Sequence, residues 1–165
     1  QGLPKGEKVE LIIQKAVEIG VTKIVLLDTA RCVVKLDSAR AEKRLVRWQR
    51  IALEAAKQCR RSIVPQVDGI YKLPQWLKEQ KLEDTLFLVP WEEEKQIGLR
   101  EVLTHSNVGR VILLIGPEGG LAEEEVELAK EYGAKPVTLG PRILRTETAA
   151  IVAAALVLYQ LGDLN

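Results

Sequence analysis

Several residue types that define whole classes of protein are rare in this sequence. Its 165 residues include only two cysteines, Cys32 and Cys59, which are too few for a disulfide scaffold and lack zinc-site spacing. No Ser-His-Asp or Cys-His arrangement forms around the single histidine, His105, which we expect in a loop. No apolar run reaches the about 18 residues of a membrane span, and residues 1–20 show no signal peptide. We therefore expect a cytoplasmic protein without membrane or metal.

Methionine is absent altogether, so we expect the sequence to be part of a longer polypeptide. Its length suits one domain with a proper core, and 47% hydrophobic and 28% charged residues are typical of a globular protein. The net charge of +1 conceals a local imbalance, because residues 31–61 hold ten Lys or Arg and three Asp or Glu. This stretch is either a solvated helix face or a surface that attracts phosphate.

The spacing of apolar residues predicts helices that alternate with strands. The predicted helices are 7–19, 38 to 59 or 61, 99–104, 123–132 and 146–161, and the strands are 24–27, 85–89, 110–115 and 135–139. Ser38 and Thr146 are predicted helix caps. This order predicts an α/β fold, a mostly parallel sheet with helices on both faces.

Ligands in such sheets bind beyond the carboxyl ends of the strands. The candidate site is therefore formed by the loops 90–94, 116–122 and 140–146. The last helix adds a second expectation, because residues 149–159 are apolar at every position. A helix that is apolar all round is buried on more than one side, which predicts a homodimer; the alternative is a central helix within one core.

Two of the three loops contain distinctive motifs. The first is Ile-Gly-Pro-Glu-Gly-Gly at residues 115–120, where glycines let backbone approach a ligand; a tight structural turn is the alternative. It lacks the spacing of a dinucleotide or P-loop fingerprint. The second is Leu-Gly-Pro-Arg-Ile-Leu-Arg-Thr-Glu-Thr-Ala at residues 139–149, where Arg142 and Arg145 suit phosphate or a developing anion. Glu147 suits the positive start of the last helix.

The long second helix has a polar row opposite its core stripe. The row contains Arg40, Arg47, Glu54, Gln58 and Arg61, and we expect it to point out of the fold, toward RNA or a neighbouring subunit. Gln58 and Arg61, nearest the helix end, are the preferred contacts.

Together, the paired motifs at residues 115–120 and 139–149 resemble the RsmE family, whose members methylate the N3 atom of a uridine in 16S ribosomal RNA with S-adenosylmethionine. Residues 13–20, 29–35 and 54–65 also resemble segments of that family, so the likeness covers nearly the whole chain. It implies a SPOUT fold with a carboxyl-terminal trefoil knot, a homodimer with the cofactor at its interface, and a substrate within the small ribosomal subunit. From the resemblance we expect residues 1–165 to form one SPOUT methyltransferase domain, without the family's amino-terminal β-barrel RNA-binding domain.

Given this cofactor, the three strand-end loops indicate which residues bind it. The expected cofactor cradle consists of Val89, Pro90, Ile115, Gly116, Glu118, Gly119, Leu139, Gly140, Ile143, Leu144 and Thr146. The expected RNA contacts, from the basic stretch and the polar row, are Arg31, Arg47, Gln58 and Arg61. Arg145 and Arg142 are expected to stabilise a uracil anion, and Glu147 or water to take its proton. Two alternatives stay open: a SPOUT enzyme with a different nucleotide target, and a non-catalytic RNA-binding module of the same fold.

Overall fold

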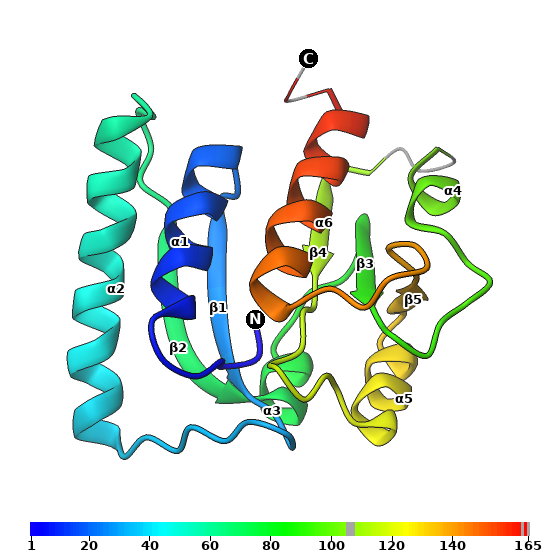
Figure 1. Cartoon of the computed structure of the whole chain (residues 1–165), viewed down its shortest axis with the longest axis horizontal. Helices are drawn as coiled ribbons and strands as arrows, with labels where there is room; N and C mark the ends of the chain where they lie inside the picture. The colour runs from blue at the N-terminus through cyan, green and yellow to red at the C-terminus, as the bar shows by residue number, and fades with distance from the viewer. Residues whose placement is uncertain (105–107, 163, 165) are drawn as a thin grey trace.

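Helices and strands alternate along the whole chain in the computed structural model, which describes residues 1–104, 108–162 and 164 (Figure 1). In order, the elements are α1 (Lys8–Ile19), β1 (Lys23–Asp28), α2 (Ser38–Gln58), β2 (Gln66–Lys72), α3 (Leu73–Lys78), β3 (Thr85–Pro90), α4 (Leu99–Thr104), β4 (Arg110–Leu113), α5 (Glu123–Glu131), β5 (Lys135–Val137) and α6 (Thr146–Gln160). The predicted alternation is confirmed; the loop expected at His105 lies outside the described residues.

All the described strand pairs are parallel, as predicted, but they form two sheets instead of the single sheet expected. β1 pairs with β2, and β3 pairs with β4 on one side and β5 on the other. Residues 1–3 connect the two sheets. The Gly2 N–H donates to the Ile115 carbonyl at 2.7 Å, and the Leu3 N–H donates to the Leu27 carbonyl at 2.9 Å. The first residues of the chain therefore lie between β1 and the end of β4.

Helices cover both faces of the strands because side chains alternate along each strand. In β3, Leu86 and Leu88 pack with residues of α4 and α6, whereas Phe87 and Val89 pack with residues of α3 and α5. In β1, Ile24 and Leu26 pack with α1 and α2. The chain thus forms three layers, with α1, α2, α4 and α6 on one face and α3 and α5 on the other.

Two predicted helix caps are wrong. The cap of α2 is Asp37, whose carboxylate accepts a hydrogen bond from the Arg40 N–H at 2.8 Å, and Ser38 is the first helical residue. Arg145 occupies the cap position of α6, and the Thr146 hydroxyl instead donates to the Gly116 carbonyl at 2.6 Å. A threonine beside a helix start therefore has a tertiary role that local sequence did not reveal.

The last helix, α6, is only partly covered by its own chain. Ala153, Ala154 and Val157 are buried, but Leu156 is 46% exposed and Tyr159 is 62% exposed. Among the described residues, no helix is both long enough and apolar enough to cross a membrane.

Candidate functional site

A cleft of about 350 Å³ lies at the carboxyl ends of β3, β4 and β5. All three predicted loops contribute to it, because parallel strands present their carboxyl ends at one edge. Its walls are Lys8, Pro90, Trp91, Glu92, Lys95, Ile115, Gly116, Pro117, Glu118, Gly120, Leu121, Thr138, Leu139, Gly140, Pro141, Arg142, Ile143, Leu144, Arg145, Thr146 and Ala149. Both sequence motifs therefore meet in one place.

Most of the residues predicted for a cofactor cradle line this cleft. The exceptions are Val89, which is fully buried in the core between β3 and α5, and Gly119, which is outside the wall. Of the predicted catalytic residues, Arg142 and Arg145 line the cleft and Glu147 does not. The Glu147 carboxylate lies beside Lys8 instead, with its side chain 16% exposed.

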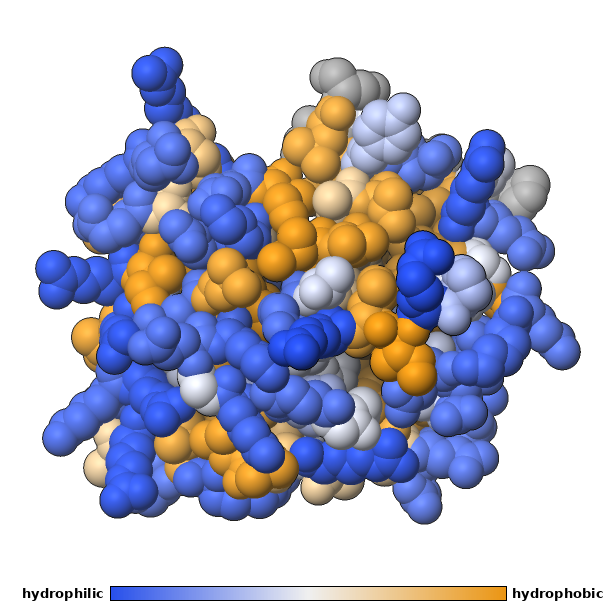
Figure 2. Space-filling view, in the orientation of Figure 1, coloured by the Kyte–Doolittle hydropathy of each residue, from blue (hydrophilic) through white to orange (hydrophobic). Residues whose placement is uncertain are grey.

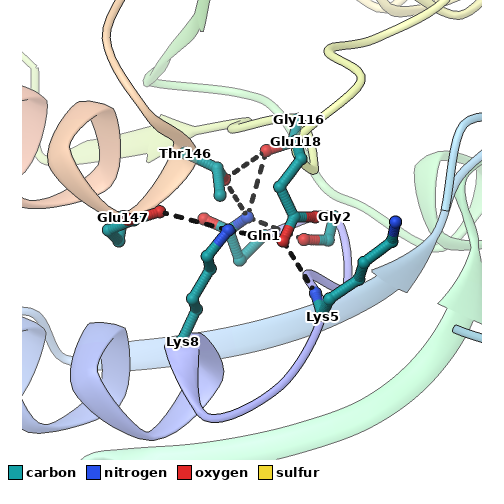
Figure 3. A network of polar contacts seen from close by, with 8 residues as sticks. All are labelled: Gln1, Gly2, Lys5, Lys8, Gly116, Glu118, Thr146 and Glu147. Atoms are coloured by element: carbon teal, nitrogen blue, oxygen red, sulfur yellow. Dashed lines mark hydrogen bonds and ion pairs between the residues drawn. The ribbon is translucent and has the colours of Figure 1, made fainter. Parts of the chain in front are cut away.

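Hydrogen bonds fix the two motif loops to each other. Thr146 Oγ1 donates to the Gly116 carbonyl, and the side-chain amide of Gln1 donates to both Thr146 Oγ1 at 3.0 Å and the Gly116 carbonyl at 3.2 Å (Figure 3). Gly116 itself allows a tight turn, because a Cβ there would lie 2.8 Å from the Gly120 carbonyl carbon. The cleft floor is thus held from residues far apart in the sequence.

Glu118 connects the first motif to the start of α1. Its Oε1 accepts hydrogen bonds from the Lys8 ammonium at 2.7 Å and from the Lys5 backbone N–H at 2.9 Å (Figure 3). Partial burial alone raises the pKa of Glu118, but hydrogen bonds from Lys8 and from the backbone N–H groups of Glu118 and Lys5 outweigh it. The pKa of Glu118 therefore lies below its usual value of 4.5, and the carboxylate is ionised at neutral pH.

We expect Glu118→Gln to destabilise the chain by about 0.5–1 kcal/mol at pH 7, the range of a partly exposed ion pair. Because the folded pKa of Glu118 is depressed, its contribution is present above pH 4.5 and is lost as the pH falls through the folded pKa. Urea unfolding at pH 7 and at lower pH should show the difference from wild type shrink with acidity. Glu83→Gln, at an exposed side chain, is the control; a difference independent of pH would contradict the assignment.

The cleft has an apolar interior and a largely basic rim. Ile115 and Leu121 are buried at its base, and Arg142 and Arg145 are exposed at its edge. Neither guanidinium has a hydrogen bond or ion pair with another described residue, so both are free to bind a ligand. Such a site suits a partly apolar ligand alongside an anionic one.

The predicted RNA contacts do not gather at the cleft. Arg31 lies nearest, since its Nη1 donates to the Gly119 carbonyl at 2.9 Å. Arg47 and Gln58 are exposed on α2, and α1 lies between α2 and α6 (Figure 1). Arg47 pairs with Glu10 at 2.9 Å. The expectation that Arg61 points out of the fold is wrong, because its Nη1 donates to the carbonyls of Val17 and Val21 at the end of α1, both at 2.8 Å.

Sequence reasoning missed several residues of the cleft wall, among them Lys8, Trp91 and Lys95. Trp91 and Lys95 fall in or just beyond the predicted loop 90–94, so only their side-chain direction was unknown. Lys8 lies in the first turn of α1, and no local pattern indicates its proximity to Glu118. Among the described residues there is no cluster of three His, Cys, Asp or Glu side chains that could hold a metal ion.

Comparison with known proteins identifies the family. Residues 1–158 match the model of the RNA methyltransferase domain. The chain belongs to this family. It is 41% identical to ribosomal RNA small subunit methyltransferase E of Bacillus subtilis, in an alignment that covers 96% of this chain and 64% of the relative. The resemblance expected from the paired motifs is therefore confirmed, and the chain spans about two thirds of the relative's length.

Two solved structures from this family share the fold. Ribosomal RNA small subunit methyltransferase E from Neisseria gonorrhoeae, bound to S-adenosyl methionine, is 37% identical with a TM-score of 0.88; the match covers 100% of this chain and 66% of that one. A putative methyltransferase from Legionella pneumophila, in complex with the same cofactor, is 37% identical with a TM-score of 0.86, covering 96% and 64%. The cleft thus belongs to a fold that binds this cofactor in both relatives.

Proposed function

We propose that this chain transfers a methyl group from S-adenosylmethionine to the N3 atom of a uridine in 16S ribosomal RNA. The observation that carries the proposal is that both family motifs meet in one cleft, in a chain 37% identical to a relative bound to this cofactor. The substrate in this proposal is the RNA within the small ribosomal subunit, in the cytoplasm. In this proposal the chain has a SPOUT fold, both motif loops form part of its carboxyl-terminal trefoil knot, and the cofactor binds at that knot.

The cleft fits the cofactor in size and character. Its volume of about 350 Å³ is within the range of about 300–1,000 Å³ for small-molecule sites. Ile115, Leu139 and Leu144 offer apolar surface for an adenine ring, and Gly116 and Gly140 expose backbone groups without side chains. We assign the cradle to these residues together with Pro90, Glu118, Ile143 and Thr146.

When bound, the cofactor supplies an electrophilic methyl group on a sulfonium. Arg145, with Arg142 beside it, would stabilise the uracil anion by donating hydrogen bonds to the carbonyl oxygens of the uracil. Alignment of the uridine N3 with the cofactor's methyl group supplies much of the acceleration. Glu147 does not suit the role of base, because it lies behind Lys8 rather than at the cleft. We therefore assign the proton to water at the open rim.

RNA would approach across this rim. Lys95, Arg142 and Arg145 form its basic side, and Arg31 lies next to the Gly116–Gly120 turn. Arg47 and Gln58 on α2 are exposed and would contact phosphates further along the RNA. We do not include Arg61 among the RNA contacts, because its guanidinium donates hydrogen bonds to the carbonyls of Val17 and Val21.

We also propose that two chains associate through α6. Apolar residues gather on the surface over α6 (Figure 2), where Leu156 and Tyr159 are exposed, and Leu11 on the neighbouring α1 is 42% exposed. Contiguous apolar surface of this kind marks interaction sites. A second copy covering α6 explains why that helix has no polar face.

Leu156→Asp should shift the chain from dimer to monomer at micromolar concentration, because it places a charge in the proposed apolar interface. Light scattering measures the mass directly. Val46→Asp is the matched control, since Val46 is an exposed apolar side chain on α2, and its mass should equal that of wild type. A monomeric wild-type chain would overturn the proposed dimer.

One experiment separates the proposed function from its alternatives. Calorimetry with S-adenosylmethionine comes first, followed by methylation of small ribosomal subunits from a strain lacking this activity and mass analysis of the nucleosides. Cofactor binding together with N3-methyluridine is the expected result. A ribose-methylated or different base-methylated product would indicate another target, and RNA binding without cofactor binding would indicate a non-catalytic module.

A further inference from the structure

The side chain of Lys8 lies between two carboxylates at the edge of the cleft. Its ammonium is 2.7 Å from Glu118 Oε1 and 3.9 Å from Glu147 Oε2 (Figure 3). Lys8 belongs to the first turn of α1, whereas Glu118 follows β4 and Glu147 begins α6. A single ammonium therefore joins the two motif segments, and it also forms part of the cleft wall.

The contact with Glu118 fixes the turn that follows β4. Glu118 Oε1 accepts from the Lys8 side chain and from the Lys5 backbone, so two donors of one segment hold it. A charged donor to an ionised acceptor makes this a strong hydrogen bond. The Gly116–Gly120 turn is thereby tied to the start of α1, with Gly116 and Glu118 both facing the cleft.

The contact with Glu147 brings the Lys8 ammonium close to a carboxylate oxygen that is shielded from solvent. Glu147 Oε2 is inaccessible to solvent and has no hydrogen-bond donor among the described residues. Lys8 is the cation that pairs with it, at a distance too long for a hydrogen bond. Lys8 therefore supplies the positive charge next to this carboxylate at the start of α6.

We propose that Lys8 is a positioning residue for the methyl-transfer site, holding Glu118 and the start of α6 in the arrangement that receives the cofactor. This inference rests on the proposed function, because it concerns the same cleft. It differs from a purely structural role, in which Lys8 would affect unfolding and leave the folded cleft unchanged.

Lys8→Met, Lys8→Arg and Lys5→Met test the inference, with calorimetry for cofactor affinity and steady-state methylation of small subunits for kcat and KM. Lys8→Met should weaken S-adenosylmethionine binding about tenfold, the effect of losing one well-placed charged contact, and raise the KM for the cofactor more than it lowers kcat. Lys8→Arg, which keeps the charge, should restore most of the affinity. Lys5→Met is the matched control, because only the backbone of Lys5 bonds to Glu118 and its side chain is exposed.

A double-mutant cycle with Glu118→Gln separates positioning from a general loss of stability. Because part of the effect of Lys8 passes through Glu118, Lys8→Met should change the affinity less once Glu118 is already glutamine than it does in the wild-type chain, since coupled residues are not additive. If the double variant lost cofactor affinity by the product of the two single losses, the inference would be overturned. Failure of Lys8→Arg to recover cofactor binding would overturn it as well. Equal cofactor binding by wild type and Lys8→Met would overturn this inference alone. No binding by wild type would overturn the proposed function and this inference with it.

Discussion

Arg145→Ala is expected to lower the rate of methyl transfer by about 100- to 1,000-fold, the effect of removing one donor that stabilises a developing anion. Arg145 lines the cleft, is exposed, and has no partner for its guanidinium among the described residues. Removing this side chain should therefore leave the free energy of unfolding unchanged. Its loss should appear as a lower rate of methyl transfer. Single-turnover methylation of small subunits at saturating cofactor measures the effect.

Cofactor affinity and stability provide the control for this variant. Because Arg145 is assigned to the uracil anion, S-adenosylmethionine should bind Arg145→Ala within about twofold of wild type, a difference of less than 1 kcal/mol. Arg100→Ala, at an exposed arginine of α4 outside the cleft wall, should methylate like wild type. Full methylation by Arg145→Ala would exclude the residue from catalysis and leave Arg142 as the remaining candidate.

Gly116→Ala should weaken cofactor binding by about tenfold to 100-fold, because overpacking of this kind strains a fold by about 1–3 kcal/mol. The new Cβ would lie 2.8 Å from the Gly120 carbonyl carbon and 2.9 Å from the Leu121 nitrogen. Both are backbone atoms, so the turn itself must open and the cleft floor must move. Calorimetry with S-adenosylmethionine measures the loss.

Gly98→Ala is the matched control for Gly116→Ala. A Cβ at Gly98 meets no atom within 4 Å, and its backbone φ is not in the left-handed region. This variant should bind the cofactor as wild type does. Equal affinities for all three proteins would show that the Gly116 turn relaxes without disturbing the cleft, and would remove Gly116 from the cradle.

The elements of this fold are largely predictable because each one carries a local signal. Apolar spacing places α1 and α4 within one residue of their observed bounds, and buried runs place β1 and β3. The caps are the exception. Ser38 and Thr146 have cap-forming side chains, but a neighbouring Asp37 competes for one site and a tertiary bond to Gly116 takes the other hydroxyl. Local propensity ranks the candidates, and long-range contacts decide between them.

The residues of the site also differ in whether local sequence predicts their position. The loops that follow strands were predictable as cleft walls because parallel strands share one edge, and Arg142 and Arg145 in the last of these loops do line the cleft. Lys8, Arg61 and Glu147 were not predictable, since their partners lie 110, 44 and 139 positions away in the sequence. No periodicity within one helix encodes such a contact.

The bonds that hold the cleft join the first residues of the chain to residues in its last third, and this arrangement has a consequence for folding. Gln1 meets Thr146, Gly2 meets Ile115 and Lys8 meets Glu118, all across more than 100 positions. Contacts of such high sequence separation form late, because loop-closure entropy must be overcome before they contribute. The core around β3 is expected to gain protection from hydrogen exchange first. The cleft should be the last part to form, so that recovery of cofactor binding reports the completion of folding.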